Sequence, residues 1–271
     1  MSYQLKPKSP AGKKYVNAAE SLTESIRYQA QAAEQSSTGA AASFDDIKTA
    51  GINEAFVPED CGGMGLSSIH DWIVGMSRLG RGDGSVALAT NKHLAVSRGL
   101  SSGRASAQTS GNDLLAKAIE AQLEQIVTGN MTICATATEP GTDNLHPLTL
   151  ATPVDDSWRV DGLKLFVTGS PIASHIAINL RVKGDDDKPD SISSVMMPPN
   201  NHRNQTTERL ERDGNERLGK PVYPIQQCLC SKSRGKPCST MGTMEHGDAN
   251  ESQSVQPPFS RCLSGYRLTR S

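Results

Sequence analysis

The chain has 271 residues, a formal net charge of −1 and 21% charged residues. That length allows two domains. A charge near zero gives no basic field of the kind that attracts nucleic acid or anionic membranes. No apolar run is long enough to cross a bilayer, and the basic N-terminal stretch lacks the apolar core of a signal peptide. These features exclude nucleic-acid-binding and membrane-embedded classes and predict a cytoplasmic protein with reduced thiols.

The first half of the chain has the apolar spacing of helices. In residues 14–33, Tyr15, Leu22 and Ile26 recur near the helical period. Similar spacing continues as far as residue 127. We therefore predict a helical bundle over residues 1–128. The expected helices cover residues 14–33, 43–50, 69–79, 85–100 and 112–127.

Two serines mark the starts of two expected helices, and a glycine marks the end of one of them. Ser43 and Ser68 can each cap a first turn, with Asp46 and Asp71 three residues later as acidic partners. Gly51 suits the end of the short helix that Ser43 opens, because glycine takes a left-handed backbone without steric cost.

The pattern changes after the helices. The stretch MTICATATE mixes β-branched with small residues. The stretch WRVDGLKLFVTG alternates around Asp161–Gly162, which predicts a hairpin turn. Further strands are expected in residues 174–183 and 191–199. The predicted fold class is therefore α+β, with the helical bundle followed by an incomplete antiparallel β-barrel domain over residues 129–200.

Two local features favour structural roles. Residues 58–67, PEDCGGMGLS, contain three glycines, but a dinucleotide-binding loop needs a clear strand before it. A sharp turn between helices is the favoured interpretation. His93 lies on an apolar helix and is expected to pack in the core rather than to bind a ligand.

The segments 136–152 and 162–174 carry residues that packing alone does not require. Pro140 and Gly141 set a turn directly after a strand, which leaves small hydroxyl residues and backbone amides facing a neighbour. Phe166 and its neighbours at a strand end add an aromatic ring and a hydroxyl. This combination suits a planar ligand that is rich in hydrogen-bond acceptors.

These residues resemble the acyl-CoA dehydrogenase family of flavoproteins, over about residues 13–200. The family carries T-E-P-G, then T-x-A, then G-x-K-x-(W/F)-(I/V)-T. The matching segments are Thr138–Gly141, Thr149–Ala151 and Gly162–Thr168, with further similarity at residues 49–67 and 82–95.

The resemblance implies a homo-oligomeric FAD enzyme that oxidises the Cα–Cβ bond of an acyl-CoA thioester. It implies that the flavin is lined by Ala137, Thr138, Phe166, Val167 and Thr168. The Thr168 hydroxyl would bond near the flavin N5, and Phe166 would pack on the ring. No metal site is expected.

Several alternatives stay open. Many family members have Trp in place of Phe166, and the usual G-x-G-S-D is shortened here to residues 141–143. Flavin monooxygenases of the same superfamily, which use reduced flavin and oxygen, are the main enzymatic alternative. A non-enzymatic partial fold is the other. No catalytic base is assigned, because the family's catalytic glutamate lies in a C-terminal helical domain that we do not find in the sequence.

Residues 201–271 lose the apolar pattern. Only nine of these 71 residues are Leu, Ile, Val or Phe, which is too few to bury a core. We predict a disordered tail. A zinc site has weak support, because the first two of its candidate ligands have C-x-C spacing. Those candidates are Cys228, Cys230, Cys238 and His246.

A shifted reading frame explains the loss. The family's next motif is W-x-x-M-G-M-R-(G/A)-(S/T)-G. With permitted codons, residues 210–220 read one base later give Trp-Asn-Gly-Met-Gly-Met-Arg-Gly-Ser-Gly, and residues 226–231 give Asn-Asn-Val-Phe-Val-Pro. We therefore predict a frameshift near residues 200–202. The chain would then lack the rest of the barrel and the oligomer-forming helical domain, and would be inactive.

Overall fold

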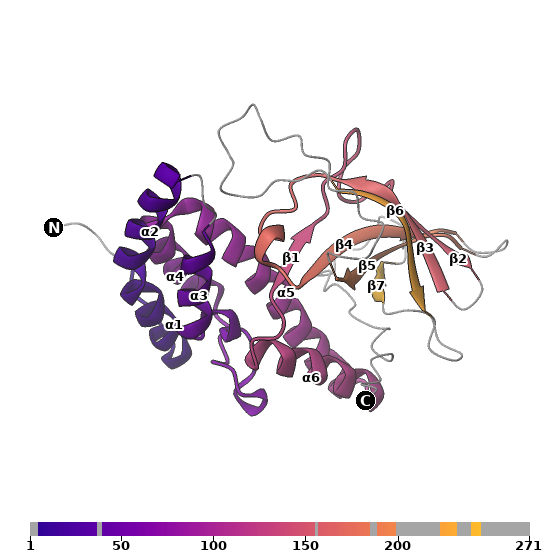
Figure 1. Ribbon diagram of the computed structural model, residues 1–271. Coiled ribbons are helices and arrows are strands. Elements are labelled where there is room, and N and C mark those ends of the chain that lie inside the picture. Colours follow the sequence, from indigo (N-terminus) through magenta and orange to yellow (C-terminus); the bar gives the residue numbers. More distant parts are fainter. Residues whose placement is uncertain are drawn as a thin grey trace, which may run out of the picture.

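Helices form one side of the molecule and a curved sheet forms the other (Figure 1). The chain changes from helix to strand between Val127 and Ile133. None of the helices among the described residues has the length and apolar character needed to cross a membrane. The computed structural model describes residues 5–36, 40–154, 157–184, 189–198, 223–231 and 240–244.

The helix predicted over residues 14–33 is in fact two helices that meet at Leu22. The α-helices are α1 (Pro10–Ser21), α2 (Thr23–Ser36), α3 (Ala41–Thr49), α4 (Ile69–Gly82), α5 (Gly84–Thr109) and α6 (Asp113–Val127). Short 3-10 turns lie at η1 (Ile52–Glu54), η2 (Glu59–Cys61) and η3 (Ser170–Ile172).

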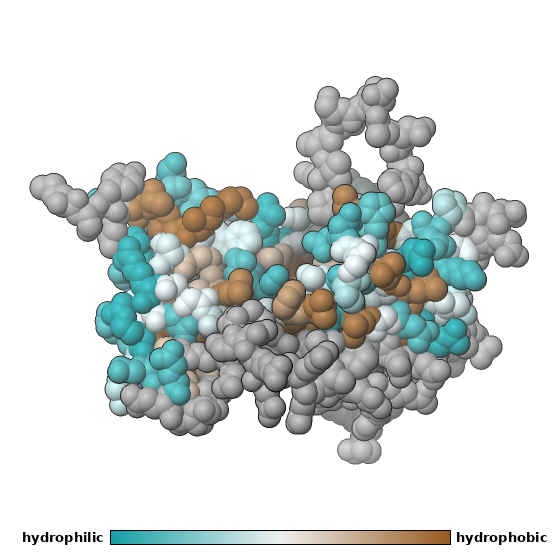
Figure 2. Space-filling model, turned by 90° about the horizontal axis from the view of Figure 1, so that it is seen from above, coloured by the Kyte–Doolittle hydropathy of each residue, from teal (hydrophilic) through white to brown (hydrophobic). Residues whose placement is uncertain are grey.

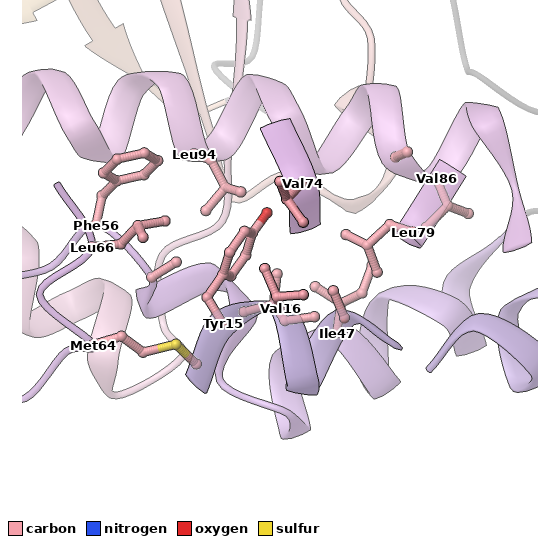
Figure 3. Packing of buried hydrophobic residues seen from close by; sticks show 14 of the residues in the cluster. Tyr15, Val16, Ile47, Phe56, Met64, Leu66, Val74, Leu79, Val86 and Leu94 are labelled. Carbon is pink, nitrogen blue, oxygen red and sulfur yellow. The ribbon is translucent and has the colours of Figure 1, made fainter. Parts of the chain in front are cut away.

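The helical core is built around Tyr15, whose ring is fully buried between α1 and α4 (Figure 3). Val16, Val74 and Leu79 lie in the same cluster. A Cβ added to Gly75 would lie 2.1 Å from the Tyr15 ring, so only glycine leaves room for it on α4. The apolar period of the sequence therefore gives the face that each of these helices buries.

Ser68 caps α4 as predicted, since its hydroxyl accepts from the Asp71 amide at 3.2 Å. The Asp71 carboxylate, the predicted acidic partner, bonds other residues. It accepts from the Ser9 hydroxyl at 2.7 Å and from the amides of Lys8 and Ser9. This buried carboxylate ties the start of α1 to α4.

The predicted cap at Ser43 is wrong. α3 begins at Ala41, and no side chain caps it. Ser43 is fully buried, and its hydroxyl donates to the Gln29 side-chain oxygen at 2.6 Å. The Ser43 hydroxyl therefore bonds a side chain of α2 instead of capping the first turn of α3. Gly51 follows the end of α3 in a left-handed conformation, as predicted.

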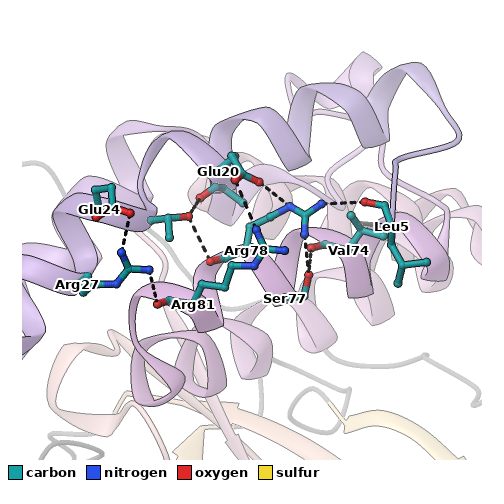
Figure 4. A network of polar contacts seen from close by, with 10 residues as sticks. Leu5, Glu20, Glu24, Arg27, Val74, Ser77, Arg78 and Arg81 are labelled. Atoms are coloured by element: carbon teal, nitrogen blue, oxygen red, sulfur yellow. Dashed lines mark hydrogen bonds and ion pairs between the residues drawn. The ribbon is translucent and has the colours of Figure 1, made fainter. Parts of the chain in front are cut away.

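A polar network joins α4 to α1 and to the N-terminal segment (Figure 4). The Arg78 guanidinium lies 2.5 Å from the Glu20 carboxylate and donates to the Leu5 carbonyl at 2.8 Å. Because the Arg78 side chain is only 6% exposed, these partners replace the water that it loses.

The sheet has the strand order β6–β3–β2–β4–β5–β7, with β1 beside β4. The strands are β1 (Ile133–Thr136), β2 (Leu150–Val154), β3 (Ser157–Lys164), β4 (His175–Val182), β5 (Ser191–Met197), β6 (Tyr223–Ser231) and β7 (Thr240–Met244). The α+β class is confirmed, but the sheet is mixed rather than antiparallel. Strands β1 and β2 both run parallel to β4. A parallel pair needs a connection that returns the chain to the same end of the sheet, and the segments that lead from β1 and from β2 to β4 are long enough for this.

The hairpin predicted at Asp161–Gly162 is also wrong, since β3 runs straight through both residues. A Cβ on Gly162 would lie 2.2 Å from the Thr149 hydroxyl. This glycine therefore serves a close approach between chain segments and not a turn. The pairing of β3 with β6 shifts register at this point.

Two segments of the predicted disordered tail form strands in the structure, while the disorder of the tail stays a prediction. β6 pairs with β3, and β7 pairs with β5, both antiparallel. Strand pairing uses backbone groups and needs no apolar period, which is why the sequence pattern gave no signal. The rest of the tail prediction, including Cys238 and His246, lies outside the described residues.

Candidate functional site

Two motif segments meet at one end of the sheet. The Leu165 amide donates to the Thr138 carbonyl at 2.9 Å, and the Thr136 hydroxyl donates to the Leu165 carbonyl at 2.7 Å. β1 and β3 are not neighbours in the sheet. These bonds therefore hold side by side two segments that strand pairing alone would leave apart.

Phe166 stands at this end with a strained backbone. Its φ of 53° makes it the one non-glycine residue with positive φ in the described part of the chain. Such a conformation costs about 1–3 kcal/mol and persists only where the surroundings enforce it. The Thr168 amide closes the turn onto the Phe166 carbonyl at 2.7 Å. The aromatic side chain is 53% exposed. Strain of this kind is a recurrent feature of functional sites.

The next residues run inward. Val167 is 1% exposed and belongs to the sheet core. Thr168 is also buried, and its hydroxyl donates to the Phe166 carbonyl at 3.3 Å. Gly169 has a φ of 88°, and a Cβ there would lie 3.4 Å from Ala89 of α5. The loop after β3 thus rests on α5.

All five predicted flavin-lining residues lie in these two segments. Thr138 and Phe166 are exposed, Ala137 is half-buried, and Val167 and Thr168 are buried. The structure therefore gathers the set at one end of the sheet. Contact of each residue with a flavin stays a prediction.

Beneath the exposed pair lies a buried ion pair that the sequence did not reveal. The Lys164 ammonium bonds the Glu139 carboxylate, and the two side chains are 0% and 1% exposed. Glu139 also accepts from the amides of Leu148 and Thr149, the latter at 3.1 Å. Burial alone would raise the pKa of Glu139, but the Lys164 ammonium and the amides outweigh burial and lower that pKa. The carboxylate is therefore held ionised.

The turn that follows is polar and open. Gly141 has a φ of 80°, as the predicted turn requires. Asp143 and His146 are exposed and lie 2.8 Å apart. The hydrogen bond from His146 lowers the pKa of Asp143. An exposed, ionised carboxylate of this kind has no buried surroundings to raise its pKa for base catalysis.

His93 packs in the core, as predicted. Its Nδ1 accepts from the Ile133 amide, and its Nε2 donates to the Asn53 carbonyl, both at 3.0 Å. Burial lowers its pKa to about 4, so the ring is neutral at pH 7. It ties α5 to β1 and to the turn at η1.

The glycine-rich loop is a turn, as predicted. The Gly63 amide donates to the Pro58 carbonyl at 3.1 Å, and the Gly65 amide donates to the Val57 carbonyl at 2.9 Å. Because these amides already have acceptors in the chain, they are not arranged to bind a phosphate.

Sequence comparison finds relatives among nitrososynthases. The amino sugar nitrososynthase DnmZ of Streptomyces peucetius is 30% identical over 183 residues, 65% of this chain and 42% of its own length. The amino sugar nitrososynthase RubN8 of Streptomyces rubradiris is 31% identical over 154 residues, 57% of this chain and 35% of its own length. The chain thus spans less than half the length of these curated relatives. No protein-family model matches it.

Structural comparison gives the fold. KijD3, solved with FMN and a dTDP-linked amino sugar, matches with a TM-score of 0.70 at 22% identity, over 85% of this chain and 56% of KijD3. Butyryl-CoA dehydrogenase from Megasphaera elsdenii matches with a TM-score of 0.65 at 17% identity, over 84% of this chain and 58% of the enzyme. The chain has the acyl-CoA dehydrogenase-like fold.

Proposed function

We propose that this chain binds a flavin where the ends of β1 and β3 meet, and that it corresponds to the flavin-binding part of a monooxygenase-type enzyme that acts on a nucleotide-linked amino sugar. The observation that carries the proposal is the meeting of the Thr138 and Phe166 segments through the Leu165 amide. The nitrososynthases support this reaction class over acyl-CoA oxidation, because the two curated proteins described above that match the chain by sequence, at 30% and 31% identity, are both nitrososynthases.

The residues present suit a flavin ring. Phe166 offers an exposed aromatic ring. Thr138 is exposed too and carries a hydroxyl, and its carbonyl accepts from the Leu165 amide next to Phe166. The Thr168 hydroxyl now donates to a main-chain carbonyl of its own turn, and it is the group we assign to the flavin edge. A bound flavin would supply the redox chemistry, with reduced flavin and oxygen as the reactants. The resemblance implied FAD, whereas KijD3 was solved with FMN, so both are candidates.

The substrate proposal follows from the relatives. The nitrososynthases are named for amino sugars, and the KijD3 structure holds a dTDP-linked one. The loop at residues 141–143 is shorter than the acyl-CoA dehydrogenase pattern. We therefore assign the substrate to the nucleotide-linked amino sugars and keep acyl-CoA as the comparison compound.

Flavin binding is tested by titrating the chain with FMN and with FAD and following flavin fluorescence. Phe166→Ala should weaken binding by about twofold to tenfold, because a stacked aromatic pair contributes roughly 0.5–1.5 kcal/mol. Leu114→Ala, at an exposed apolar residue of α6, is the matched control and should bind as wild type. Failure of the wild type to bind either flavin, or equal binding by Phe166→Ala, would contradict the proposal.

A competition experiment then tests the substrate class. We expect a dTDP-linked amino sugar to perturb the spectrum of the bound flavin, and an acyl-CoA to leave it unchanged. A spectral change with the acyl-CoA and none with the amino sugar would favour an acyl-CoA substrate instead.

A further inference from the structure

The buried pair of Glu139 and Lys164 lies directly behind the exposed residues of the proposed flavin site. Glu139 follows Thr138 in the chain, and Lys164 precedes Leu165. The pair and the Leu165–Thr138 hydrogen bond are therefore consecutive connections between the same two segments.

The Glu139 carboxylate uses both oxygens. Oε1 accepts from the Lys164 ammonium, Oε2 accepts from the Leu148 amide, and the Thr149 amide donates to both oxygens. One side chain thus fixes three segments: the end of β1, the start of β2 and the end of β3. Each partner is a charged group or a main-chain donor, so each contact is directional.

Stability alone does not explain such a pair. Removing two charges from water costs free energy that their attraction only partly returns, and apolar residues of similar volume often stabilise a fold equally well. In this protein the carboxylate of the pair is bonded at both oxygens, which restricts the segments that it joins to one geometry. Here that geometry includes the residue next to Lys164 and the strained turn at Phe166 that follows.

We propose that Glu139 and Lys164 are positioning residues that set the spacing between Thr138 and Phe166, and thereby the orientation of the isoalloxazine ring of a flavin. This inference rests on the proposed flavin binding. Neither side chain touches the ring. They hold the main chain on either side of it, so that the backbone at Phe166 cannot relax from its positive φ.

The test compares wild type with the double variant Glu139→Gln/Lys164→Met, which removes both charges and leaves no unpaired ion. In the flavin-free chain, we expect amide hydrogen exchange at Leu165 to become faster, because the two segments open locally more often once the ion pair is lost. Amides of β4, from His175 to Val182, should exchange as before.

The same variant is titrated with FMN and FAD. Its dissociation constant should rise about 10–100-fold, the range over which metal sites lose affinity when a supporting residue is removed. The visible bands of bound flavin should move toward those of free flavin. The matched control is Asp71→Asn, which disturbs a buried carboxylate between α1 and α4. That change should lower the melting temperature without altering Leu165 exchange or the bands of bound flavin.

Wild-type Leu165 exchange together with wild-type flavin affinity in the double variant would overturn the inference. If wild type itself binds neither flavin, the proposed function fails. Leu165 exchange then still decides whether the pair holds the two segments together.

Discussion

At the scale of single residues, the backbone of Phe166 is the feature most directly linked to function. A left-handed conformation costs a side-chain-bearing residue about 1–2 kcal/mol that glycine does not incur. We expect Phe166→Gly to be more stable than Phe166→Ala by about 1 kcal/mol, although neither retains the ring. Urea unfolding of the two variants measures the difference. Equal stability would mean that the turn is not strained.

His93 gives a second prediction, in the pH dependence of stability. Its pKa is about 4 in the folded chain and about 6.5 when unfolded, because burial disfavours the charged ring. Above pH 6.5 the ring is neutral in both states and its contribution is complete. Between pH 6.5 and 4 the unfolded state gains the proton first, which lowers the free energy of unfolding by roughly 3 kcal/mol.

The comparison for His93 is His93→Gln, whose amide can both donate and accept at the same place. Its stability should fall less steeply between pH 6.5 and pH 4 than that of wild type. Chemical unfolding across this range provides the measurement. If the free energy of unfolding fell equally steeply with pH in both proteins, the loss of stability would not come from His93.

At the scale of elements, Gly162 decides how closely β3 approaches the chain before β2. A Cβ there would lie 2.2 Å from the Thr149 hydroxyl and 2.7 Å from its Cα. Gly162→Ala should therefore destabilise the fold by about 1–3 kcal/mol, the usual cost of overpacking. Gly84→Ala, on α5 with nothing within 4 Å, is the control and should be neutral or stabilising. An unchanged melting temperature for Gly162→Ala would contradict this packing.

Elements were predictable from sequence where one apolar face fixes the period, as in α4 and α6. The role of Gly162 was ambiguous from sequence. Its position after Asp161 is typical of a turn, but in the structure it allows β3 to lie close to Thr149. The resemblance placed Thr138 and Phe166 at one site, and their segments do meet. Glu139 and Lys164 were missed because the two residues are 25 positions apart and meet only through the tertiary fold.

At the scale of the whole molecule, the origin of residues 201–271 stays a prediction. The pairing of β6 and β7 with the sheet uses backbone groups, so it does not decide which reading frame encodes them. Reading the gene one base later from about codon 201 should give the glycine–methionine motif and then a long open frame. Sequencing the locus tests this. Stop codons soon after the shift would rule the frameshift out.

We expect a flavin ring to lie across the point where the ends of β1 and β3 meet. The most direct measurement is a crystal structure of the chain with FMN or FAD. We predict ring density within about 4 Å of the Phe166 side chain, with a ring edge at the Thr168 hydroxyl. Flavin density at another place on the chain, with Phe166 still facing solvent, would show that the flavin does not bind at these strand ends.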